Sequence, residues 1–174
     1  MRFKLHLIIC TVICAITILF STSPLALARI PYSYLNIGGL TPDQVINYTY
    51  EIYGRPTDTL IVKSLDGFSI YEATYNSELM VYYISGGYNE DRRVRAIVCS
   101  EDNISTNRGI KVGMNSDDVL SNYGQPDKTY SETNGYTWCY YSSSEDHPNM
   151  PMYFFFDKNN TIYTIVVGDI GYYY

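Results

Sequence analysis

Two stretches of this 174-residue sequence decide the fold prediction: GLTPDQV at residues 39–45 and GMNSDDV at residues 113–119. In each stretch a good helix N-cap residue, Thr41 or Asn115, is followed three residues later by a side chain that can bond back to the amide of the cap. Such a capping box predicts the start of a helix. Its occurrence at two places in the chain indicates an internal repeat.

Two further matching stretches, YGRP at residues 53–56 and YGQP at residues 123–126, predict the ends of both helices. Each places a glycine where helices commonly end in a left-handed residue, and a proline two residues later. The sequence therefore predicts one helix over residues 42–53 and a second, shorter helix over residues 116–123.

Segments rich in aromatic and β-branched residues follow each helix, which indicates β-strands. The dipeptides Asp66-Gly67 and Asn134-Gly135 are typical of hairpin turns, so one more strand should precede each of them. We therefore predict an α+β fold of two tandem repeats, each a short helix packed on a four-stranded antiparallel sheet. The strand segments cover residues 68–75, 79–84 and 94–100 in the first copy, and residues 136–142, 152–156 and 162–168 in the second.

The polar residues 101–108 lack apolar periodicity and mark the boundary between the two copies. The first repeat then covers residues 29–102 and the second covers residues 103–174. Because a domain of this size buries too little surface to be very stable by itself, we expect the two halves to form one cooperative body.

The first 28 residues have the features of a secretory signal peptide. A basic start with Arg2 and Lys4 precedes an apolar run from Leu7 to Phe20, and small residues flank the expected cleavage site after Ala28. The apolar run is shorter than the roughly 20 residues that span a bilayer. We therefore expect a secreted or periplasmic protein of the cell envelope, with no stable membrane insertion after cleavage.

Signal cleavage makes the chain more acidic. It removes Arg2 and Lys4 but no acidic residue, so the net charge changes from −6 to −8. A chain of this charge is not expected to bind nucleic acid. Two cysteines remain, Cys99 and Cys139, and an exported protein meets an oxidising compartment, so they form a candidate disulfide. The alternative is two buried apolar thiols.

Few residues of the exported chain suit catalysis or metal binding. His147 is its one histidine, and it falls in a polar segment typical of a loop. A nucleophilic pair of His147 with Cys139 would still lack an orienting third group and a recognisable oxyanion site. We therefore predict a protein that is not an enzyme, with no catalytic residue, no bound metal and no cofactor.

Aromatic residues are the strongest functional signal, since the chain has 20 tyrosines, 6 phenylalanines and 1 tryptophan. Strand alternation over residues 136–142 puts Cys139 beneath the helix and turns the neighbouring aromatic residues to the opposite face. Tyrosine and tryptophan are enriched at recognition surfaces. The alternative is that the tyrosines serve the core and the packing of the sheet, and a shift of one residue would exchange the two faces. We predict a binding surface formed by Tyr136, Trp138, Tyr140, Tyr153 and Glu72.

The helix starts and stops, together with Trp138-Cys139-Tyr140 in a strand, resemble the tandem-repeat fold of the β-lactamase inhibitory proteins. A single copy is also similar to the small lipoprotein of the outer-membrane β-barrel assembly machinery, and it matches best at residues 113–119 and 124–126. The resemblance covers about residues 37–170. Its motifs describe a helix-to-sheet unit, so the resemblance implies a fold more than an activity.

These observations predict an exported, non-enzymatic protein-binding module that uses an aromatic sheet face to bind an unknown protein partner. A first alternative is an envelope-assembly or structural accessory protein, for which the aromatic residues should be mostly buried. A second alternative is an inhibitor of a secreted or periplasmic hydrolase. An inhibitor should have a protruding loop, for which residues 85–89 and 142–148 are the candidates.

Overall fold

The computed structural model describes residues 29–86, 92–142 and 150–169. The predicted signal peptide at residues 1–28 lies outside the described residues, and so do His147 and most of the two candidate inhibitory loops.

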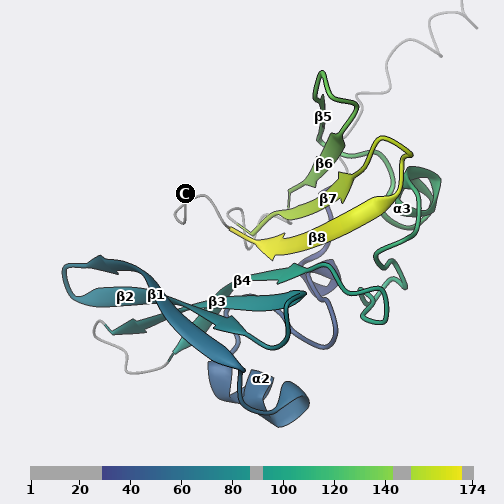
Figure 1. The fold of residues 1–174 in the computed structure, drawn as a ribbon. Helices are drawn as coiled ribbons and strands as arrows, with labels where there is room; N and C mark the ends of the chain where they lie inside the picture. The colour runs from purple at the N-terminus through teal and green to yellow at the C-terminus, as the bar shows by residue number, and fades with distance from the viewer. Residues whose placement is uncertain (1–28, 87–91, 143–149, 170–174) are drawn as a thin grey trace, which may run out of the picture.

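The described chain forms one antiparallel sheet with two short α-helices and a 3₁₀ turn (Figure 1). The order of the strands in the sheet is β1-β2-β3-β4-β8-β7-β6-β5. Among the described residues, neither helix is long and apolar enough to cross a membrane. The elements are η1 (Tyr32–Tyr34), α2 (Ile46–Tyr53), β1 (Asp58–Leu65), β2 (Phe68–Thr74), β3 (Leu79–Gly86), β4 (Arg93–Cys99), α3 (Ser116–Tyr123), β5 (Lys128–Ser131), β6 (Thr137–Tyr141), β7 (Met152–Phe156) and β8 (Ile162–Gly168).

The predicted fold of two tandem repeats, each a helix on its own four-stranded sheet, is wrong because all eight strands belong to one continuous sheet. The last strands of the two halves, β4 and β8, pair along their edges from Ala96↔Gly168 to Cys99↔Ile165. Each of these strands would otherwise present unpaired backbone groups at a sheet edge, which is unfavourable when the edge is long and apolar. Pairing between strands this far apart in sequence has no local signature.

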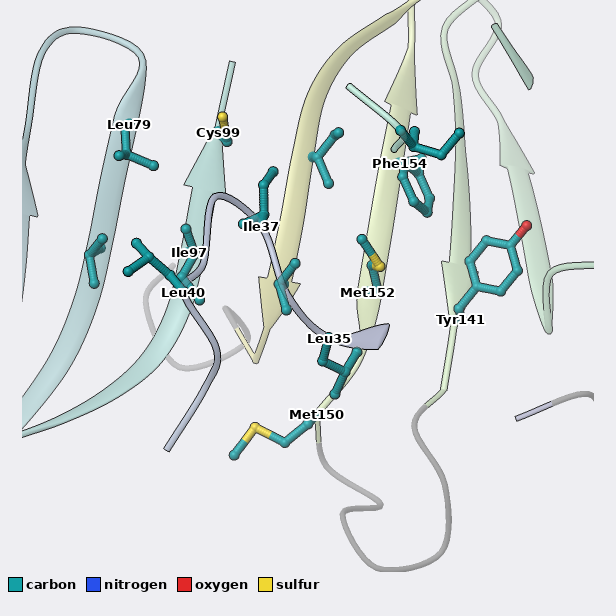
Figure 2. Close-up of a cluster of buried hydrophobic side chains, with 14 of the residues drawn as sticks. Leu35, Ile37, Leu40, Leu79, Ile97, Cys99, Tyr141, Met150, Met152 and Phe154 are labelled. Carbon is teal, nitrogen blue, oxygen red and sulfur yellow. The ribbon is translucent and has the colours of Figure 1, made fainter. Parts of the chain in front are cut away.

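The hydrophobic core lies on one face of this sheet. Both helices contribute to it, and the N-terminal segment crosses the middle of the face (Figure 2). Leu35, Ile37 and Leu40 of that segment are fully buried with Ile97 and Met152 of the strands. Full burial of one such side chain stabilises a fold by about 1.5–3 kcal/mol, so this segment fixes the covered face of the sheet.

Helix α3 begins and ends where the sequence predicts, at Ser116 and Tyr123. The side chain of Asn115 accepts hydrogen bonds from the amides of Asp117 and Asp118, and the Asp118 carboxylate accepts one from the amide of Asn115. The capping box predicted at this helix is therefore confirmed.

Helix α2 begins at Ile46, so the predicted start at residue 42 is wrong. The carboxamide oxygen of Gln44 does accept a hydrogen bond from the Thr41 amide at 3.1 Å, but it closes a turn in which Asp43 has φ = 63°. Backbone hydrogen bonds from the Asp43 amide to the Val94 carbonyl and from the Val94 amide to the Gln44 carbonyl hold this turn against β4, and the helix begins only after the extended residue Val45. Tertiary pairing thus overrides a local capping signal.

Candidate binding surface on the open sheet face

The face of the sheet opposite the core carries a row of aromatic side chains on β5, β6 and β7. Trp138 pairs with Tyr130 on one side and with Phe155 on the other, and Tyr140 pairs with Tyr153. Because directly opposite residues of antiparallel strands point to the same face, these rings share one surface. We call this surface the aromatic face; it consists of these five rings together with Tyr136, just before β6, and Tyr163 on β8, whose rings contact it.

The rings of the aromatic face contact one another without interruption. Trp138 and Tyr130 are stacked, with ring centroids 3.9 Å apart and planes 17° from parallel. On the other side, the Trp138 ring lies 5.9 Å from Tyr153 and 6.1 Å from Phe155. Aromatic pairs at such separations contribute about 0.5–1.5 kcal/mol beyond their buried area, so the rings hold each other in place.

The cluster extends to both sides of this centre. Tyr140 lies 5.3 Å from Tyr153, and Tyr163 lies 6.2 Å from Phe155 and 5.7 Å from Tyr136. The surface is therefore a connected patch of seven rings.

None of the seven rings is fully buried. Tyr130, Tyr136 and Tyr163 are 41%, 39% and 43% exposed, and the other four are half-buried. Other tyrosines, such as Tyr83 and Tyr141, are buried in the core on the opposite face. The chain thus uses tyrosine both in its core and on an accessible surface.

Three charged residues, Lys128, Glu132 and Asp169, lie near the aromatic face. The Lys128 ammonium lies 6.0 Å from the centroid of the Tyr140 ring, a cation–π geometry. Burial, and then the neighbouring Tyr140, raise the pKa of Tyr153 to about 12. Burial, with the nearby Glu132 carboxylate, also raises the pKa of Tyr163. These two hydroxyls are therefore neutral at physiological pH and can both donate and accept hydrogen bonds.

Four of the five predicted binding residues lie together on this face: Tyr136, Trp138, Tyr140 and Tyr153. Glu72 does not join them. It shares the open face but lies on β2, five strand spacings from β6, or roughly 24 Å along the sheet. The strand order of the single sheet therefore excludes Glu72 from the predicted binding surface.

Sequence reasoning missed Tyr130, Phe155 and Tyr163. Phe155 and Tyr153 both alternate with buried residues along β7, so they point to the same face. Tyr130 lies before the predicted hairpin turn, and this turn pairs it with Trp138. The alternation along the strand therefore predicts Phe155, and the hairpin turn predicts Tyr130, as members of the aromatic face. Tyr163 lies at a register shift between β7 and β8, which no local pattern indicates.

Cys99 and Cys139 are free, buried thiols in this structure. Both belong to one row across the sheet, in which Cys99 pairs with Ile165, Ile165 with Phe154, and Phe154 with Cys139. Three strand spacings separate them, roughly 14 Å, whereas a disulfide needs Cα atoms within about 7 Å. The geometry therefore favours the alternative of two buried thiols.

A cavity of about 220 Å³ lies between α3 and the core-facing side of β5 and β6, and Cys139 contributes to its wall. Burial raises the pKa of the Cys139 thiol, so this sulfur is a poor nucleophile. Among the described residues, no charged side chain lines the cavity and no three potential metal ligands lie together. The lining residues are Ser116, Val119, Leu120, Gln125, Pro126, Thr129, Thr137, Cys139, Tyr141, Phe156 and Asn160.

The fold and the aromatic face together define a β-rich protein in which the described helices pack on one side of a single sheet. No protein-family model matches the chain, and no curated protein sequence matches it. Solved structures that are similar to it include the three described below. None of the three is described as a β-lactamase inhibitory protein or as an assembly lipoprotein, so that resemblance stays a prediction.

The first is an extracellular protein containing a SCP domain from Bacillus anthracis, with 10% identity and a TM-score of 0.46, covering 74% of this chain and 44% of that chain. The second is a cysteine-rich secretory protein from Staphylococcus aureus, with 14% identity and a TM-score of 0.47, covering 82% of this chain and 49% of that chain. The third is a DUF4309 family protein from Bacillus subtilis, with 13% identity and a TM-score of 0.41, covering 81% of this chain and 87% of that chain. The chain spans less than half the length of the first two, and a likeness at this level defines neither a family nor a function.

Proposed function

We propose that this chain is an exported, non-enzymatic module that binds another protein through the aromatic face. The observation that carries the proposal is the connected patch of seven rings, all at least partly accessible, on the sheet face that the helices leave open. Apolar patches of this kind, rimmed by polar residues, are typical of interaction sites in soluble proteins.

The chemistry of the patch supports a protein partner. Tyrosine and tryptophan provide large, stiff contact areas with a polar group at the edge, and they dominate the binding energy of many protein interfaces. Because the rings pack against each other on a sheet, little side-chain entropy is lost when a partner binds. The acidic net charge, −6 for the full sequence and −8 after the expected signal cleavage, makes a nucleic acid an unfavourable partner.

The proposed location is the exterior of the cell or its envelope, and it rests on the signal peptide expected from the sequence at residues 1–28. The envelope is therefore the fraction in which to search for the partner.

Affinity capture tests the proposal. The purified protein is immobilised, and an envelope extract of the source organism is passed over it with the wild type, Trp138→Ala and Tyr48→Ala in parallel. Tyr48 is the matched control because it is 50% exposed on α2, whose buried residues face the core on the other side of the sheet. Truncation of a central aromatic anchor commonly weakens binding by about 30-fold, or about 2 kcal/mol.

We expect Trp138→Ala to lose a captured protein that the wild type and Tyr48→Ala retain. Equal capture by all three proteins would contradict a role for the aromatic face. A hydrolase among the captured proteins whose activity falls on binding would instead favour the inhibitor alternative.

A further inference from the structure

Strand β1 forms one edge of the sheet, and all eight of its residues are exposed. Its exposed residues include large apolar side chains on both faces, with Leu60 54% and Ile61 60% exposed. A long, apolar edge strand is a template for pairing with another strand unless its sequence prevents it. The strand contains no proline, and Lys63 is its one basic residue.

The register of β1 is unusual in a way that suits pairing with a second copy of itself. Val62 is skipped in the ladder with β2, because Ile61 pairs with Tyr71 and Lys63 pairs with Ile70. Because of this bulge, the alternation of side chains between the two faces shifts by one residue after Val62. As a result, Leu60 and Lys63 point to the same face, as their partners Glu72 and Ile70 show.

An eight-residue strand that overlaps fully with an antiparallel copy of itself places its first residue opposite the last residue of the copy. Without a bulge, each such pair would join residues of opposite faces, since the residue numbers of its two members differ by an odd number. With the bulge at Val62, the pairs Asp58–Leu65, Thr59–Ser64 and Leu60–Lys63 all lie on matching faces. The bulge therefore makes the fully overlapping register compatible with one continuous sheet.

The charges of the strand favour the same orientation. Asp58 is near its start and Lys63 is near its end, so an antiparallel copy brings each carboxylate diagonally across from an ammonium on the same face. Ile61 and Val62 lie next to the two-fold axis, where Ile61 of one copy is opposite Val62 of the other.

We infer that β1 pairs antiparallel with β1 of a second copy of this chain, and that the two sheets then join into one across a two-fold axis. This dimer contact is separate from the aromatic face, which lies at the other end of the sheet on β5–β7 (Figure 1). One edge contact is a small interface, so the dimer is expected to dissociate in the micromolar range.

Sedimentation equilibrium of the purified protein, up to about 0.5 mM, tests this contact because it covers that range of dissociation constants. We expect a concentration-dependent dimer. Ile61→Lys places two like charges beside the two-fold axis and should raise Kd by at least about tenfold. Ser131→Lys is the matched control, since it adds the same charge to the exposed opposite edge strand, β5. Far-UV circular dichroism and thermal melting check that each variant folds.

Charge reversal distinguishes self-pairing from a general loss of solubility. Asp58→Lys or Lys63→Asp alone should weaken the dimer, and the double variant should restore it, because only the antiparallel copy brings these two residues together. A protein that stays monomeric throughout the range would overturn the inference and leave this edge to a strand of another protein. A dimer that Ser131→Lys disrupts as much as Ile61→Lys does would also overturn it.

Discussion

Trp138 is the one tryptophan of the chain, so its fluorescence reports on the aromatic face alone. The indole is half-buried and stacked on Tyr130 at 3.9 Å. We expect Tyr130→Ala to make Trp138 more accessible to acrylamide and to lower the free energy of unfolding by about 1 kcal/mol, the usual contribution of such a pair. Tyr48→Ala on α2 is the control and should leave quenching unchanged. Unchanged quenching in Tyr130→Ala would mean that the stacking does not shield the indole.

The raised pKa values of three tyrosines predict a loss of stability at alkaline pH. Burial is the main cause at each residue, and it raises the pKa of Tyr83, Tyr123 and Tyr153 to about 12. A raised folded-state pKa means that the folded protein favours the neutral phenol, so its stabilising contribution is complete below the unfolded pKa of about 10. This contribution is lost as the pH rises from about 10 to about 12.

We therefore expect the urea midpoint of unfolding to be lower at about pH 11 than at about pH 9. Tyr153→Phe keeps the ring but removes one titrating hydroxyl, so its midpoint should fall less over the same interval. A midpoint that is equally pH-dependent in both proteins would show that Tyr153 does not contribute.

At the scale of single elements, the two helix starts predict different responses to the same kind of substitution. Asn115 caps α3 through its side chain, whereas the N-cap of α2 is Val45, which has no side-chain cap. Asn115→Ala should therefore destabilise the protein by about 1 kcal/mol. Thr41→Ala should cost less, because Thr41 lies in a turn before the helix. Thermal or urea unfolding of both variants measures this difference, and an equal cost would contradict it.

Most strand boundaries could be predicted from the sequence because they depend on local signals. The strand expected over residues 152–156 matches β7, and the one over residues 162–168 matches β8. Alternating aromatic and β-branched residues between turn residues specify such segments. The start of α2 could not be predicted, since the competing interaction is a backbone pairing with β4, which lies about 50 residues later in the chain.

At the scale of the whole molecule, strand neighbours explain which parts of the site were predictable. Tyr140 and Trp138 were placed on the open face by the period of one strand, and Tyr153 joins them through the adjacent strand β7. Glu72 shares the open face, but the pairing of β4 with β8 puts β2 far from β6. Long-range pairing of strands depends on the edges that remain after local hairpins form, and a single sequence does not record it.

The junction between β4 and β8 also determines whether the two halves unfold together. Gly168 pairs with Ala96 at this junction and has φ = +99°. A Cβ atom on Gly168 would lie 2.1 Å from the backbone oxygen of Arg95 and 2.9 Å from the Cα atom of Ala96, so an alanine requires the two strands to separate. We expect Gly168→Ala to lower the free energy of unfolding by at least about 3 kcal/mol.

Gly113→Ala is the matched control, because Gly113 has a similar φ of +91° but its Cβ would meet nothing within 4 Å. It should show only the cost of the backbone strain, about 1 kcal/mol. If the sheet is one cooperative unit, circular dichroism and Trp138 fluorescence should report the same midpoint in the wild type and in Gly168→Ala. Trp138 is on β6, in the half that also contains Gly168, so its fluorescence follows that half, whereas circular dichroism follows the whole sheet. A Trp138 midpoint that matches only one of two steps in circular dichroism would show instead that the halves fold as separate units.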